Sequence, residues 1–168
     1  MTYTDWEQTV PEEITADSVW SVKAYRLALF IAELSWYDAT KLLGDKRTIS
    51  LADQLYRSAG SISANIEEGF SRGTGRDRAR FYEYALGSAR ETRGWCYKGG
   101  HVLDELVVTH RISLLTEIVK LLLTMVPDQR RQALREDPVA YVTESIWAEA
   151  PAESAVAELL QNVPMPLP

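Results

Sequence analysis

The sequence predicts an all-α protein: an antiparallel up-and-down four-helix bundle with an additional, partly helical C-terminal extension. Apolar residues recur every three or four positions in four successive stretches of the chain, which is the spacing of one face of an α-helix. Short breaks with glycine or proline separate these stretches, and short connections make consecutive helices antiparallel. A chain of 168 residues can form one domain with a substantial core.

The first helix is expected from about residue 18 to Leu43, with Asp17 or Ser18 as its N-cap. One apolar stripe is expected to face the core: Val22, Tyr25, Leu29, Ala32, Trp36, Ala39 and Leu43. Further apolar residues lie outside that stripe: Leu27, Phe30, Ile31 and Leu34. A helix that is apolar on more than one face usually has more than one partner, so the second set predicts an oligomer interface.

Three more helices follow. The second is expected to start at Thr48 or Ser50 and to continue to Glu68, with Gly69 as its stop. The third begins with Thr74 or Asp77 as its cap and closes near Gly99. One side of the third helix is expected to carry Phe81, Ala85, Ser88, Thr92 and Trp95. These assignments complete the second and third members of the bundle.

The fourth helix is expected over residues 109–126, and Pro127 is expected to stop it because proline lacks the N–H that a helix interior needs. Beyond it, Val139–Ala148 and Ala152–Leu160 have helix-like patterns and enough apolar residues to dock on the bundle or on a neighbouring chain. Residues 163–168 alternate with proline and are expected to be extended and mobile.

Charge is unevenly distributed along the chain. The net charge is −6, but residues 1–17 hold five acids and no base, and residues 127–168 hold seven acids and three bases. Residues 18–126 therefore keep 15 bases and 12 acids, a net charge of +3. We interpret the chain as a loose acidic arm (1–17), a mildly basic four-helix bundle (18–126) and a C-terminal extension (127–168).

The composition favours a reduced compartment. Cys96 is the single cysteine, and together with His101 and His110 it lacks the clustered spacing of a structural zinc site. No basic start or long apolar run indicates a signal peptide or a membrane span. The bacterial cytoplasm is the expected location, and no metal, cofactor, membrane or small-molecule substrate is expected.

Four arginines lie within nine residues around the second connection: Arg72, Arg76, Arg78 and Arg80. The glycine-rich turn beside them lacks the lysine of a phosphate-binding P-loop and follows a helix instead of a strand, so an ordinary turn is favoured over a nucleotide site. Contacts with a nucleic-acid backbone require charge and little geometric precision. Two interpretations stay open for these arginines, a nucleic-acid contact and a solvated basic face.

A polar ladder runs beside the apolar stripe of the second helix and continues on the third: Gln54, Arg57, Ser61, Asn65, Glu68, Ser88 and Glu91. Paired acids can do acid and base chemistry, but no nucleophile with an orienting histidine accompanies them. A hydrogen-bonded seam that fixes helix register is favoured over catalysis, because buried polar groups must find partners. Aromatic residues that could stack on bases are instead expected in the core or an interface: Trp20, Trp36, Trp95 and Tyr97.

The order of several short motifs resembles one known family. The motifs are Arg57-Ser58, Ser61-Ile62, Asn65-Ile66-Glu67-Glu68-Gly69, the basic turn from Arg72 to Arg76, and Gly87-Ser88 with Glu91. Together they resemble the four-helix-bundle proteins first noticed as reading frames in intervening sequences of bacterial 23S ribosomal RNA genes, the S23 family. They are also similar to the accessory variability determinant of diversity-generating retroelements. The resemblance covers about residues 19–126 and not the two ends.

The resemblance implies a pentameric ring with a central channel, and for the retroelement relative it implies binding of a reverse transcriptase and nucleic acid. The leading hypothesis is therefore a non-enzymatic, homo-oligomeric accessory protein that binds RNA or DNA and partners a reverse transcriptase. The alternative is an oligomeric scaffold that recruits a protein without touching nucleic acid. Family members are often strongly basic, whereas the expected bundle of this chain carries only +3.

Overall fold

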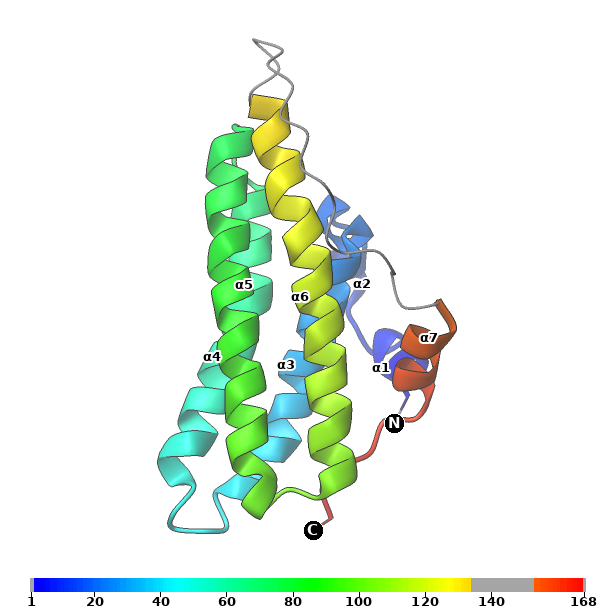
Figure 1. Ribbon diagram of the computed structural model, residues 1–168. Coiled ribbons are helices and arrows are strands. Elements are labelled where there is room, and N and C mark those ends of the chain that lie inside the picture. The colour runs from blue at the N-terminus through cyan, green and yellow to red at the C-terminus, as the bar shows by residue number, and fades with distance from the viewer. Residues whose placement is uncertain (1, 134–152, 168) are drawn as a thin grey trace.

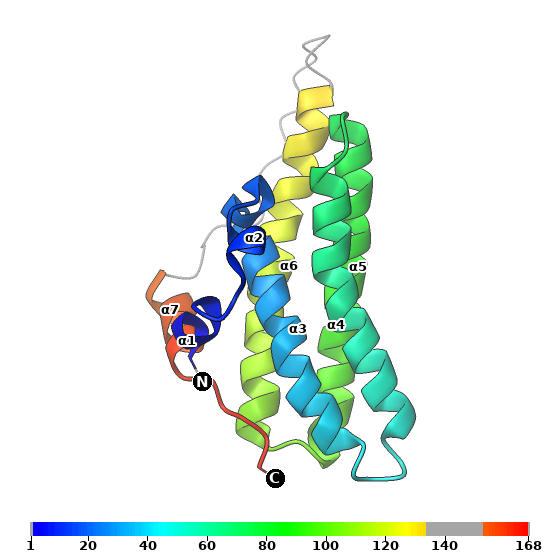
Figure 2. The same cartoon turned by 180° about the vertical axis from the view of Figure 1, so that it is seen from behind.

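The computed structural model describes residues 2–133 and 153–167. Four long helices run up and down in turn (Figures 1 and 2): α3 (Lys23–Leu42), α4 (Ile49–Phe70), α5 (Gly75–Lys98) and α6 (Glu105–Ala133). Successive helices pack on each other, and α6 returns to pack on α3. Short connections join them, the last containing a 3₁₀ turn at Gly99–His101. The all-α prediction is confirmed.

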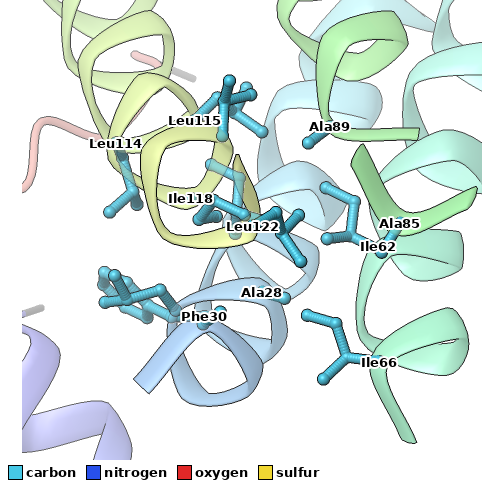
Figure 3. Close-up of a cluster of buried hydrophobic side chains, with 14 of the residues drawn as sticks. Ala28, Phe30, Ile62, Ile66, Ala85, Ala89, Leu114, Leu115, Ile118 and Leu122 are labelled. Carbon is cyan, nitrogen blue, oxygen red and sulfur yellow. The ribbon is translucent and has the colours of Figure 1, made fainter. Parts of the chain in front are cut away.

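The core lies on the bundle axis and takes residues from all four helices. Ala28 of α3, Ile62 of α4, Ala85 of α5 and Leu122 of α6 are fully buried, and Figure 3 shows these four residues on the sides of their helices that face one another. Each large apolar side chain that is removed from water contributes about 1.5–3 kcal/mol. This shared burial holds the four helices together.

The expectation for the two faces of α3 is wrong. Leu27 and Ile31, expected at an oligomer interface, are exposed by only 2% and 1%, whereas Trp36, expected in the core, is 58% exposed. Both faces of the helix are apolar, and periodicity does not say which one meets the other helices. The structure decides it by packing α4 and α6 on the face of Leu27 and Ile31.

Pro127 does not end the last helix, contrary to expectation. Helix α6 starts at Glu105 and continues through Pro127 to Ala133. Proline inside a helix costs about 3 kcal/mol. Contacts with the bundle lie on both sides of it, since Val126 is 8% exposed and Arg130 pairs with Glu83 of α5. We attribute the continuation of α6 to this packing.

The N-terminal segment is not the loose arm expected from its acids. It forms α1 (Tyr3–Glu7), α2 (Glu12–Thr15) and a 3₁₀ turn at Ser18–Ser21. A capping box between Thr2 and Asp5 begins α1. The Trp6 side chain is 6% exposed, and its ring centre lies 5.1 Å from that of Phe30. Aromatic burial anchors a segment that is too short to show helical periodicity.

The C-terminal extension docks beside the N-terminal segment. Helix α7 (Glu153–Gln161) confirms the helix expected over Ala152–Leu160, and it packs on α1 and α6 (Figures 1 and 2). Val156 is 8% exposed, and Val163 packs against the core. The helix expected over Val139–Ala148 lies outside the described residues. Among the described helices, none combines the length and the apolar character that a membrane span requires.

Candidate nucleic-acid interface

The basic turn lies at one end of the bundle, where α4 passes the chain to α5 (Figure 1). Helix α4 extends past Gly69 to Phe70, so Gly69 does not stop the helix as expected. Its role is close packing: a Cβ atom at Gly69 would lie 2.8 Å from Tyr82 Cε1 and 3.0 Å from Phe81 Cβ. The missing side chain lets the first turns of α5 approach α4.

Thr74 caps α5, as one of the two expected candidates. Its hydroxyl accepts a hydrogen bond from the backbone N–H of Asp77 at 3.1 Å and donates one to the Asp77 carboxylate at 2.7 Å. The cap fixes where α5 begins. It thereby sets the direction of the arginines on its first two turns.

Three of the four predicted arginines are held by neighbours. Arg72 pairs with Glu68 and lies over the Phe81 ring, 4.7 Å from its centre. Arg78 donates from Nε to the Arg72 carbonyl at 2.8 Å. Backbone and side-chain contacts of this kind orient the guanidinium groups while leaving donors available to a ligand.

Arg80 and Arg76 extend this basic surface along α5. Arg80 donates from Nε to the Tyr84 hydroxyl at 2.7 Å, which raises the pKa of Arg80, and lies over the ring of this exposed tyrosine. Arg76 is exposed and forms no hydrogen bond or ion pair with a described residue. Two acids, Glu68 and Asp77, lie in the same turn region and reduce its net charge.

The predicted polar seam is not assembled between helices within the described chain. Ser61 donates to the Arg57 carbonyl at 2.8 Å, Asn65 to the Ser61 carbonyl at 2.7 Å, and Ser88 to the Tyr84 carbonyl at 3.1 Å. Arg57 pairs with Asp53, Glu68 with Arg72, and Glu91 accepts from Trp95, all within one helix or its end. Gln54 is half-buried on the same helix.

The polar contact that does join α4 to α5 uses other residues. The Thr92 hydroxyl donates to the Ser58 hydroxyl at 3.0 Å, and both side chains are buried. The sequence predicts Thr92 on the same side of its helix as Ala85, and Ser58 belongs to the Arg57-Ser58 motif. In the sequence, the only indication of this contact is a small hydroxyl residue beside the apolar stripe of each helix.

A larger buried polar cluster lies toward the other end of the bundle and was not expected. Arg111 of α6 is 0% exposed and Asp38 of α3 is 1% exposed. Arg111 donates from Nε and Nη2 to the two Asp38 carboxylate oxygens, at 2.8 and 3.0 Å. Such a bidentate pair satisfies both charges where water is absent. Burial raises the pKa of Asp38, and the hydrogen bonds from Arg111 oppose that change.

His110 connects this pair to the C-terminal extension. Arg111 Nη1 lies 2.9 Å from His110 Nδ1, and His110 Nε2 lies 2.7 Å from the Leu159 carbonyl of α7. Because guanidinium only donates, Nδ1 must accept and Nε2 must carry the proton. Burial lowers the pKa of His110, and the Arg111 charge lowers it further. The cluster therefore has a structural role in holding α7.

A family model described as "23S rRNA-intervening sequence protein" matches residues 19–131. The match includes all of α3, α4 and α5, the basic turn and most of α6. The chain belongs to the 23S rRNA-intervening sequence protein family.

One solved structure adds a likeness of fold. It is described as a protein of unknown function from the S23 ribosomal protein family of Bacteroides thetaiotaomicron VPI-5482. It is 24% identical, covers 61% of this chain and 97% of its own, and superposes with a TM-score of 0.58. No curated protein matches the chain. In this member of the 23S rRNA-intervening sequence protein family, α1, α2 and α7 lie outside the family match.

The bundle leaves two of the four aromatic residues that were expected in the core or an interface exposed, which places these two outside the core. Trp36 is 58% and Tyr97 is 74% exposed, while Trp20 and Trp95 are half-buried. Trp36 contacts Tyr56 across an open groove between α3 and α4, with ring centres 5.8 Å apart. Leu29 and Ala32, from the stripe expected in the core, line this α3–α4 groove.

Cysteine and histidine form no catalytic or metal centre within residues 2–133 and 153–167. Burial raises the pKa of the Cys96 thiol to about 12, so this residue acts as a small apolar group of the core, as expected. Among the residues that the structure describes, no three of His, Cys, Asp and Glu gather as metal ligands would. His101 is exposed at the end of the bundle opposite the basic turn.

Proposed function

We propose that this member of the 23S rRNA-intervening sequence protein family is a non-enzymatic, homo-oligomeric accessory protein that binds the backbone of RNA or DNA at the basic turn. One observation carries the proposal: oriented arginines project from the start of α5, and Arg76 among them has no described partner. Phosphate contacts need such donors and little else. The exposed Tyr84 ring beside Arg80 offers a surface for a base.

The experiment is a titration of the protein into fluorescein-labelled single-stranded RNA and DNA, read by anisotropy at two salt concentrations. We expect affinity to fall steeply with salt, and the variant Arg76→Glu/Arg80→Glu to bind at least tenfold more weakly. The salt slope should fall by about 1.4 for each protomer in contact with a single strand.

The matched control is Lys46→Glu/Arg47→Glu, which changes net charge equally in the exposed connection at the opposite end of the bundle. It should bind like the wild type. An equal loss of affinity in both double variants would mean that binding depends on net charge alone. No binding at low salt would refute the nucleic-acid role and favour a protein-recruiting scaffold.

The α3–α4 groove supports the oligomeric part of the proposal. A second apolar stripe on α3, with Trp36 exposed beside Tyr56, is the kind of surface that a partner covers. The resemblance implies a pentameric ring. We expect Trp36→Glu to yield a smaller species in sedimentation velocity with unchanged helical circular dichroism. An unchanged assembly would refute this interface.

A reverse transcriptase is the protein partner that the resemblance adds to the proposal. A reverse-transcriptase gene beside the gene for this chain would support it. Co-purification of the two proteins would test it directly. If nucleic acid bridges them, co-purification should be lost in Arg76→Glu/Arg80→Glu; if they contact each other directly, it should persist. If this protein does not co-purify with a reverse transcriptase encoded by an adjacent gene, the proposed partnership is refuted.

A further inference from the structure

A cavity of about 490 Å³ lies at the same end of the bundle as the basic turn. All four long helices contribute to it: the start of α3, the end of α4, the first turns of α5 and the later part of α6. Figures 1 and 2 show these parts meeting at that end. We call this cavity the end pocket. Sequence reasoning missed it because its walls come from segments far apart in the chain.

The charged side chains that line the end pocket are both basic. Lys23 is the first residue of α3 and Arg78 lies on the first turn of α5. Arg78 uses Nε for the Arg72 carbonyl, so its terminal nitrogens remain available. No carboxylate is among the described residues that line the pocket. Its charge therefore favours an anion.

The start of α3 adds backbone donors. Val22, the N-cap, provides no side-chain hydrogen bond, and the N–H groups of Tyr25 and Arg26 turn back to the Val22 carbonyl. The N–H groups of Lys23 and Ala24 donate to no group in the described chain. First-turn N–H groups point out along the helix axis, where they and the helix dipole attract negative charge.

One buried side chain in the pocket has unused hydrogen-bonding capacity. Tyr82 is 3% exposed, yet its hydroxyl bonds no described residue. Burial raises the pKa of Tyr82, which keeps the hydroxyl protonated as a donor. Gln129 also lines the pocket. An unpartnered hydroxyl on a side chain that is otherwise buried points to a ligand with an acceptor group.

The rest of the wall is apolar. Phe70, Leu121 and Met125 also line the cavity. A phosphate alone would leave this apolar surface uncovered, whereas a nucleoside brings a flat ring that can cover it. A phosphate monoester, with a charge near −2, matches two cations better than the single charge of an internal diester.

We propose that the end pocket binds the phosphate monoester of a nucleotide, at the end of a nucleic-acid strand or as a free nucleotide. Lys23, Arg78, the first N–H groups of α3 and the Tyr82 hydroxyl hold the phosphate oxygens. The apolar wall holds the nucleoside. The strand-end form of this proposal rests on the proposed nucleic-acid function, because the basic turn would carry the strand to the pocket.

The first test uses isothermal titration calorimetry with adenosine 5′-monophosphate, adenosine and inorganic phosphate. We expect the monophosphate to bind at least tenfold more tightly than either fragment. The variants Lys23→Gln and Tyr82→Phe should each lower its affinity about tenfold, which is the loss of one charge-assisted hydrogen bond. Lys46→Gln, an exposed lysine at the opposite end, is the matched control and should change nothing.

The second test separates the two sources of the monoester. A 12-nucleotide strand is compared with and without a 5′-phosphate and with and without a 3′-phosphate. A preference for a phosphorylated end that disappears in Lys23→Gln supports the strand end. Binding of the monophosphate without any such preference supports the free nucleotide.

Other outcomes overturn the proposal. If inorganic phosphate binds as tightly as the monophosphate, the nucleoside makes no contribution to binding. If the affinity is unchanged in folded Lys23→Gln and Tyr82→Phe variants, the ligand does not bind in the end pocket. Arg76→Glu/Arg80→Glu should weaken strands with and without an end phosphate alike and leave the end preference intact. The failure of the end pocket and the failure of the basic turn are therefore distinguishable.

Discussion

The two ends of the bundle use the same type of side chain in opposite ways. Toward one end, Arg111 is 0% exposed and donates hydrogen bonds to Asp38 and His110. At the other, Arg76 is exposed without a described partner and Arg78 faces a cavity. Removing a charge from water is costly unless it is paired. Arg111 is thus committed to structure, whereas the arginines of the basic turn are available to a ligand.

The difference shows where binding capacity can be found in a helical bundle. At the Arg111 end, all three guanidinium nitrogens of Arg111 have an acceptor, and His110 holds α7 through the Leu159 carbonyl. At the basic end, the N–H groups of Lys23 and Ala24 and the Tyr82 hydroxyl have none among the described residues. Unsatisfied donors beside cations, and not the number of cations, distinguish the candidate site.

The largest effect is expected at the buried pair. Arg111→Met leaves the Asp38 carboxyl buried without its partner and should lower the free energy of unfolding by about 3–5 kcal/mol. Urea denaturation followed by circular dichroism measures it. Arg57→Met, which breaks an exposed pair with Asp53 at 3.7 Å, is the control and should cost under about 0.5 kcal/mol.

A double variant sharpens this prediction. Asp38→Leu/Arg111→Met replaces both partners by apolar groups and should recover most of the loss, because no charge remains buried. If Arg111→Met costs no more than Arg57→Met, the buried pair does not contribute as the structure indicates.

A smaller effect is expected at two helical glycines. Gly69→Ala puts a Cβ at 2.8 Å from the Tyr82 ring and should destabilise the fold by about 1–3 kcal/mol while disturbing the end pocket. Gly87→Ala, with nothing within 4 Å of its Cβ, should stabilise by up to about 1 kcal/mol through helix propensity. Thermal denaturation compares them. Stabilisation by both substitutions would contradict the close approach of α4 and α5.

The smallest effect is the pH dependence that His110 contributes. Its folded-state pKa is lowered from 6.5, mainly by burial. Below pH 6.5 the unfolded chain therefore binds a proton that the folded chain does not, and stability falls as the pH drops from 6.5 toward the lowered pKa. Above 6.5 this contribution is constant. Glu117 and Glu158 line the cavity beside His110 and are present in all the proteins that are compared.

The measurement is the urea midpoint between pH 7.5 and 5 for the wild type and His110→Gln. The wild type should lose more stability over that range than the variant. The exposed His101→Gln is the matched control and should keep the wild-type dependence. Parallel curves for all three proteins would contradict the role of His110.

Much of the bundle could be predicted from periodicity, because helices bury a stripe that recurs in the sequence. Leu55, Ile62 and Ile66 are buried as their spacing indicates. The candidate site was less predictable. The arginines of the turn were visible as a local cluster, but Lys23 and Gln129 are more than one hundred residues apart and meet only in the folded chain. Asp38 and Arg111 could have been suspected as charges within apolar stripes.

The sequence by itself determined the all-α class, the family, and the glycine-rich basic turn with its two candidate caps, Thr74 and Asp77. These are local properties, set by side chains three or four positions apart. Only the tertiary structure decided which apolar face of α3 is buried, that Trp6 docks on Phe30, that α6 continues through Pro127, and which donors remain unsatisfied. Those outcomes depend on which surfaces from distant parts of the chain pack together in the core. Helical periodicity is a local property and does not specify that packing.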